Sequence, residues 1–134
     1  MLLLKRLEKY LKNSETKMTQ ERYFKMCEQM AKEPIEDEIP PDINDFPEIA
    51  VSALEVFSNL GNRVYADIGF TGKDFTNLPF YMQIYKVPKE DTELFLEILT
   101  YLERYAIESS QDSLKREREK LKRKSSGGHN KHKV

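Results

Sequence analysis

The sequence predicts an all-α protein, a small bundle of about five helices with a long C-terminal helix and a disordered basic tail. Two observations predict this class. Apolar residues recur every three or four positions over most of the chain, which is the spacing of one helix face. Residues typical of helix starts and helix ends bound these periodic segments. With 39% hydrophobic residues, the chain also carries enough apolar side chains for one core.

The first periodic segment, residues 2–12, is a short basic amphipathic helix. Its apolar face consists of Leu3, Leu4, Leu7, Tyr10 and Leu11. Because charge follows the first leucines at once, we do not interpret this region as an export signal. We assign residues 1–17 to an amphipathic N-terminal extension and residues 18–112 to the helical domain. Cys27, the only cysteine, rules out an internal disulfide framework and favours a reducing compartment.

The second helix is expected to begin after Thr19, a good N-cap residue, and to end near Glu33, because Pro34 disfavours helical geometry in the residue before it. Its inward positions are Tyr23, Phe24, Cys27, Met30 and Ala31.

Residues 33–48 form an acidic, proline-rich connector within this domain. They hold seven acidic residues and no basic ones, with four prolines between them. We predict an extended, polyproline-like segment. Two interpretations stay open: a solvated linker, or a docking strip for a basic partner that uses Glu36, Asp37 and Glu38.

The third helix should start at a capping box, with Asp45 as the cap and Glu48 as its partner. Its buried stripe consists of Ala50, Ala53, Leu54, Phe57 and Leu60, and Gly61 follows as a stop signal. For residues 63–77 we predict an irregular loop with short extended pieces. Phe70 and Phe75 flank its glycine turn, either as core anchors or as an exposed contact surface.

The fourth helix is expected over residues 78–86, capped by Asn77, with Phe80, Tyr81, Ile84 and Tyr85 facing inward. Pro88 then opens the last and longest helix. Acidic residues near its start and basic residues near its end both suit the helix dipole. Residues 113–134 should form a charged, solvent-exposed helix end followed by a disordered tail from Ser125.

The strongest local charge lies between Lys115 and Lys124, where seven residues are basic and two are acidic. The candidate partner-binding cations are Lys115, Arg116, Arg118, Lys122 and Arg123. Three interpretations stay open: a solvated helix, a surface for an acidic protein partner, or a nucleic-acid surface. The net charge of −1 and the lack of interleaved aromatic residues weigh against nucleic acid.

No residue pattern indicates catalysis. The only histidines, His129 and His132, fall in the expected tail, so neither a metal site nor a histidine general base is predicted. The glycines around Phe70 do not have the spacing of a phosphate-binding loop. We therefore expect a non-enzymatic protein with no cofactor. No apolar run approaches the roughly 18 residues that a membrane helix needs, so no membrane partner is expected.

Several short segments resemble a group of small proteins from the tail-gene clusters of T4-like bacteriophages, especially marine ones. The segments are Met18 to Gln29, Glu33-Pro34, Ile39-Pro40-Pro41, Asp45-Phe46-Pro47 and Gly72-Lys73-Asp74-Phe75. The resemblance covers about residues 18–124, and Met18 matches the position where those proteins begin.

The resemblance implies a tail-assembly chaperone or baseplate-hub assembly factor in the host cytoplasm. Its partner would be another phage tail protein, either a tape-measure or a baseplate-hub component. Two alternatives remain. One is a small nucleic-acid-binding regulator that uses the basic C-terminal helix, and the other is a structural subunit of the virion.

Overall fold

The computed structural model describes residues 2–131, and their side chains as far as Ser125. In this part of the chain, five α-helices are joined by three short 3-10 helices and one pair of β-strands. The mostly helical class is thus confirmed, but the fold is not purely α. The chain divides into two compact units, Met1–Ser52 and Ala53–Val134, which we call unit 1 and unit 2.

Unit 1 begins with helices α1 (Leu2–Glu15) and α2 (Gln20–Gln29). Thr19 caps α2 as predicted, because its hydroxyl accepts the backbone N–H of Arg22 at 3.1 Å. The helix ends before Glu33, where we expected it to stop. Ala31 adopts a left-handed conformation, and the N–H of Lys32 closes the end of the helix on the carbonyl of Cys27 at 2.9 Å. This Schellman arrangement satisfies carbonyls that would otherwise lack partners.

The acidic segment after α2 is not the extended connector that we predicted. It forms two 3-10 turns, Glu36–Glu38 and Ile43–Asp45. Side chains of α2 hold it: the Tyr23 hydroxyl accepts the N–H of Ile35 at 3.1 Å and donates to Glu38 at 3.3 Å. These bonds satisfy polar groups that an extended linker would leave to water, and they fix the segment against α2.

The buried apolar residues of unit 1 are Leu7, Tyr23, Cys27, Phe46 and Ala50. Phe46 meets the edge of the Tyr10 ring at 5.6 Å between centroids. Phe24, Met30 and Ala31, which we expected to face inward, are exposed. Only one side of this short helix is covered, so the periodic pattern overestimates the buried face of α2.

Helix α3 (Glu48–Asn59) carries the boundary between the units. The predicted cap of this helix is wrong, because the Asp45 carboxylate accepts the N–H of Asp42 at 3.2 Å within the preceding turn. In unit 2, the buried apolar residues are Ala53, Val56, Leu60, Phe95, Ile98, Leu99 and Leu102. Leu54 and Phe57, which we also placed in the buried stripe, are half-buried.

Helix α4 (Leu78–Ile84) packs against the end of α3 through its tyrosines. The Asn59 side-chain amide donates to the Tyr85 hydroxyl at 3.3 Å, and the Tyr81 hydroxyl donates to the Asn59 carbonyl at 3.5 Å. Phe80 and Ile84 are exposed instead of buried, because a helix of two turns covers its neighbour with one side only. The side chain of Asn77 makes no capping hydrogen bond, contrary to our prediction.

Strands β1 (Gly61–Tyr65) and β2 (Gly69–Asp74) form an antiparallel hairpin where we predicted an irregular loop with short extended pieces. Tyr65 pairs with Gly69 across a three-residue turn, and Gly69 has the positive φ of 83° that such turns favour. Arg63 pairs with Gly72 and Val64 with Phe70, so Thr71 is an extra residue on β2. That bulge interrupts the alternation by which a strand is recognised in sequence.

After a 3-10 turn (Lys89–Asp91), helix α5 (Thr92–Lys131) completes the chain. Its backbone is helical to Lys131, whereas we expected disorder from Ser125 onward. Lengthening an existing helix needs no new nucleus, which favours this continuation. Residues 132–134 of the expected tail, and all side chains from residue 126, lie outside the described part.

Candidate functional site

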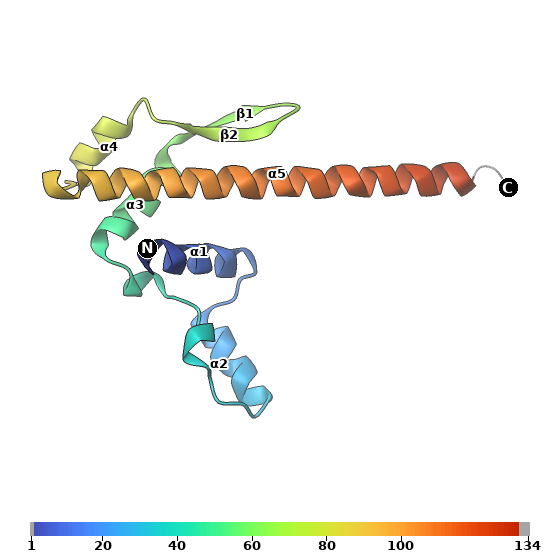
Figure 1. Ribbon diagram of the computed structural model, residues 1–134, viewed down its shortest axis with the longest axis horizontal. Coiled ribbons are helices and arrows are strands. Elements are labelled where there is room, and N and C mark those ends of the chain that lie inside the picture. Colours follow the sequence, from blue (N-terminus) through green and yellow to red (C-terminus); the bar gives the residue numbers. More distant parts are fainter. Residues whose placement is uncertain (1, 132–134) are drawn as a thin grey trace. The chain divides into compact units, whose positions relative to one another are not determined.

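The hairpin of unit 2 lies beside α5, with β2 between β1 and the helix (Figure 1). Gly72 makes this approach possible, because a Cβ atom there would lie 3.1 Å from the Glu103 carboxylate. The same carboxylate accepts the backbone N–H of Lys73 at 2.9 Å. Helix α5 therefore covers the outer edge of β2 and gives it a hydrogen-bond acceptor.

The tip of the hairpin reaches further along α5 through Gly69. A Cβ atom on Gly69 would lie only 2.7 Å from a methyl carbon of Leu114. Beyond it, the Arg118 guanidinium donates to the carbonyl of Asp67 at 2.9 Å. These contacts place the turn of the hairpin next to the basic half of α5.

Lys73 is the buried charged residue of this unit, with 8% of its surface exposed. Its amine donates to the carbonyl of Leu60 at 3.2 Å and lies 4.6 Å from the centre of the Phe57 ring. Burial lowers the pKa of the Lys73 amine. Since Leu60 directly follows α3, the amine closes the C-terminal end of that helix, which is a structural role. This burial was not predicted, because a lysine between Gly72 and Asp74 is typical of an exposed loop.

Three of the five predicted cations lie on one side of α5. We call Lys115, Arg118 and Lys122 the basic stripe. Together with Gln111, Leu114 and Glu119 they line a hollow of about 500 Å³. The other two predicted cations, Arg116 and Arg123, are exposed and do not line it.

Exposed apolar side chains accompany the basic stripe. We call Val64, Tyr65 and Ile68 the apolar tip of the hairpin, and all three are more than half exposed. Leu121 of α5 is another exposed apolar residue, with 67% of its surface exposed. Phe70 and Phe75 are both half-buried. Both predicted roles, core anchor and contact surface, therefore stay open. The apolar tip was not singled out from the sequence, since its residues lay in a segment without periodicity.

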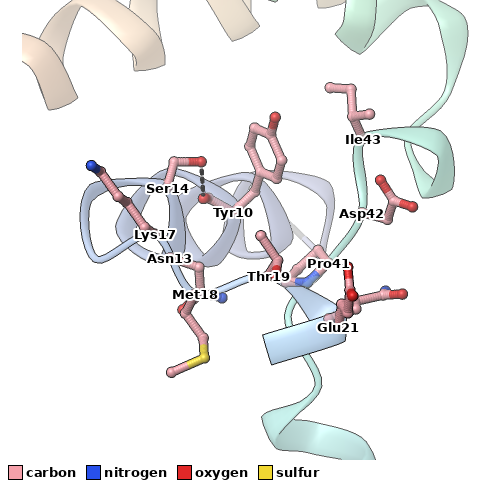
Figure 2. Close-up of a pocket in the computed structure, with 11 residues that line it drawn as sticks. Tyr10, Asn13, Ser14, Lys17, Met18, Thr19, Glu21, Pro41, Asp42 and Ile43 are labelled. Atoms are coloured by element: carbon pink, nitrogen blue, oxygen red, sulfur yellow. Dashed lines mark hydrogen bonds between the residues drawn. The ribbon is translucent and has the colours of Figure 1, made fainter. Parts of the chain in front are cut away.

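Unit 1 contains a pocket of about 650 Å³ between the end of α1, the start of α2 and the segment around Pro41 (Figure 2). Its lining is mixed, with the polar Lys17, Thr19 and Asp42 beside the apolar Met18 and Ile43. The amide nitrogen of Asn13, another lining residue, is buried without a hydrogen-bond partner in the described part of the chain. The lining includes no histidine or cysteine, and the Ser14 hydroxyl in Figure 2 donates to the backbone carbonyl of Tyr10 at 2.9 Å.

The three predicted acidic residues lie outside this pocket. Glu36, Asp37 and Glu38 occupy the first 3-10 turn of unit 1, and all three are exposed. Glu38 accepts a hydrogen bond from Tyr23, and the backbone carbonyl of Asp37 accepts one from the Lys9 amine. Glu36, Asp37 and Glu38 therefore form an exposed acidic turn that hydrogen bonds from Tyr23 and Lys9 hold in place.

Among the described residues, no group of three or more histidine, cysteine or acidic side chains is arranged to hold a metal ion. The side chains of His129 and His132 are outside the described part. None of the helices within residues 2–131 has both the length and the apolar character that crossing a bilayer requires. No protein-family model, curated protein or solved structure matches the chain.

Proposed function

We propose that this chain is a non-enzymatic protein of phage tail assembly that binds another tail protein through unit 2. The binding surface consists of the basic stripe on α5 and the apolar tip of the hairpin. One observation carries the proposal: exposed apolar side chains and a row of cations lie next to each other on two elements that hydrogen-bond to each other.

The two kinds of side chain would have different tasks in binding. Exposed apolar groups such as Val64 and Ile68 gain free energy when a partner removes them from water. The cations of the basic stripe attract a partner of opposite charge and orient its approach. The partner segment that fits both features is an acidic amphipathic helix lying along α5.

The phage context rests on the similarity of the short segments between residues 18 and 124 to proteins of T4-like tail-gene clusters. Within that context the expected partners are the tape-measure protein and the components of the baseplate hub. A chaperone role in the host cytoplasm and a permanent place in the virion are both compatible with such binding. Mass spectrometry of purified particles separates them, because a chaperone would be missing from the finished virion.

The direct test is co-expression of the tagged chain with individual tail proteins encoded beside it, followed by affinity capture. A triple variant, Lys115→Gln, Arg118→Gln and Lys122→Gln, should lose most of the capture. The matched control, Arg116→Gln, Lys120→Gln and Arg123→Gln, removes the same charge from another side of the same helix and should retain it. Failure of the unmodified chain to retain any tail protein would refute the proposal.

The alternative of nucleic-acid binding uses the same cations and is tested with the same variants. Lys and Arg side chains bind phosphates with a steep dependence on salt. If the unmodified chain shifts duplex DNA at low salt and the Lys115/Arg118/Lys122 variant does not, the regulator alternative gains. If neither binds DNA, it is removed.

A further inference from the structure

The two edges of the hairpin in unit 2 differ in a way that indicates a second binding event. The outer edge of β2 is covered by α5, and the N–H of Lys73 turns away from β1 to reach Glu103. In an antiparallel pair, residues that face each other without exchanging hydrogen bonds both turn these groups outward. Since Asn62 faces Lys73, the N–H and C=O of Asn62 point away from the hairpin.

The same alternation makes Val64 the next outward residue on β1. Arg63 lies between them and points toward β2, where its carbonyl accepts the Thr71 hydroxyl at 3.1 Å. The extra residue of the bulge, Thr71, belongs to β2, so β1 keeps its regular alternation. All five residues of β1 are exposed. This strand thus presents an open edge, which is a template for pairing with another strand.

We propose that β1 pairs with β1 of a second copy of this chain, antiparallel and across a two-fold axis, with Val64 opposite Val64. The product is a four-stranded sheet in the order β2, β1, β1, β2. The outward groups of the two Val64 residues exchange a pair of hydrogen bonds at its centre. This inference does not rest on the proposed function, since it is argued from the backbone edge of β1 and not from the basic stripe, but the two surfaces share Val64 and Tyr65 of the apolar tip.

Charge selects this register over its neighbour. A two-fold axis at Arg63 would bring two guanidinium groups directly opposite each other, which is destabilising in a sheet. An axis at Val64 instead places each Arg63 opposite Tyr65 of the second copy. Arginine over a tyrosine ring is an attractive cation–π pair, and the symmetry produces it twice. In this register β1 is complementary to itself. A second copy of this chain is therefore the partner that fits the open edge of β1.

The association should be weak. Two paired strands of five residues each bury less area than the roughly 1,200–2,000 Å² of a stable interface. We expect a monomer–dimer equilibrium that depends on concentration, measurable by sedimentation equilibrium of the full chain between about 10 μM and 1 mM, in the range of weak affinities.

Charge changes at Tyr65 test the pairing, because this side chain is 59% exposed and the hairpin should therefore tolerate its replacement. Tyr65→Glu should tighten the dimer, since each new carboxylate faces Arg63 of the second copy. Tyr65→Lys should weaken it for the opposite reason. With two symmetric pairs, we expect a change of about fivefold in each direction. Circular dichroism of both variants should match that of the unmodified chain.

Cysteine cross-linking tests the register. In the proposed pairing, the Cα atoms of the two Val64 residues are about 5.5 Å apart, within the reach of a disulfide. The Cα atoms of the two Asn62 residues are separated by four residues along the strand, or about 13 Å. Val64→Cys should therefore form a covalent dimer on mild oxidation, and the matched control Asn62→Cys should not. Both variants retain the buried Cys27.

Three results would overturn the proposal. The first is a monomer at 1 mM for both the unmodified chain and the Tyr65→Glu variant. The second is a dimer that does not respond to charge at position 65, which would place the interface elsewhere, for example on α5. The third is a cross-link at Asn62→Cys that is as strong as the one at Val64→Cys.

Discussion

The two halves of helix α5 have the same backbone and opposite surroundings. Between Phe95 and Leu102 the helix contributes four of the buried apolar side chains of unit 2. Between Lys115 and Lys124 every residue is exposed. The first half is held by packing, whereas the second half relies on residues with high helix propensity, mainly Lys, Arg and Glu.

One helix can therefore contribute to stability with its first half and to recognition with its second half. Substitutions of buried side chains in the first half should lower the free energy of unfolding, because these side chains pack in the core. Most of those in the second half are free to bind a partner, whereas Arg118 also donates to the turn of the hairpin. The junction lies near Leu114 and Arg118, where the tip of the hairpin makes its contacts with the helix.

The largest effect is expected in the first half. Phe95 is fully buried, so Phe95→Ala should lower the free energy of unfolding by about 3–5 kcal/mol. The control in the second half is Leu121→Ala, which should change it by less than about 0.5 kcal/mol because Leu121 is exposed. Urea denaturation measures both. Equal losses would show that the two halves do not differ as described.

The next effect concerns the junction. Gly69→Ala forces a Cβ atom into a backbone with positive φ and against Leu114, so it should cost about 1–3 kcal/mol. Adding Leu114→Ala removes the close contact but leaves the strained φ, so a double-mutant cycle in urea should show partial recovery. If the double variant shows no recovery beyond additivity, the tip of the hairpin does not rest on Leu114.

A smaller effect should appear at alkaline pH. Burial lowers the pKa of Lys73 in the folded state, so the unfolded chain binds its proton more tightly. Between that lowered pKa and about 10.4, the unfolded state holds more protons, and the free energy of unfolding therefore rises with pH. Below this window the contribution is constant. Denaturation curves measured over a pH series should show this rise for the unmodified chain and no such rise for Lys73→Met. If the free energies of unfolding of the two proteins changed with pH in the same way, the burial of a charged amine would be contradicted.

The smallest effect on stability is expected for the basic stripe. The triple variant at Lys115, Arg118 and Lys122 should unfold within about 1 kcal/mol of the unmodified chain, because exposed charges contribute little and Arg118 loses one exposed hydrogen bond, to the carbonyl of Asp67. Its binding to a tail protein should nevertheless fall, and added salt should weaken the binding of the unmodified chain. A large loss of stability would mean that the second half of α5 also supports the fold.

Local signals predicted much of the helical structure. Thr19 was expected to cap α2 and does so, since capping involves only neighbouring residues. Asn77 occupies the N-cap position of α4 as expected, but its side chain makes no capping hydrogen bond, although its residue type is just as suitable. The basic cations were located in the sequence, but their division into a stripe and a separate side required the helix register. The apolar tip could not be foreseen, because its residues gather only when the hairpin forms.

Sequence patterns alone indicate that this protein is mostly helical, where most of its helices lie and where its charge is concentrated. These properties follow from spacings of three or four residues and need no distant contact. The folded structure was needed to show that residues 61–74 form a hairpin, that Lys73 is buried, and that one edge of the hairpin is covered while the other is open. The hairpin was hidden by the bulge at Thr71, which breaks the alternation of β2, and its covered edge depends on a group far along the chain, the Glu103 carboxylate that accepts from the backbone of Lys73. No local pattern records such a meeting.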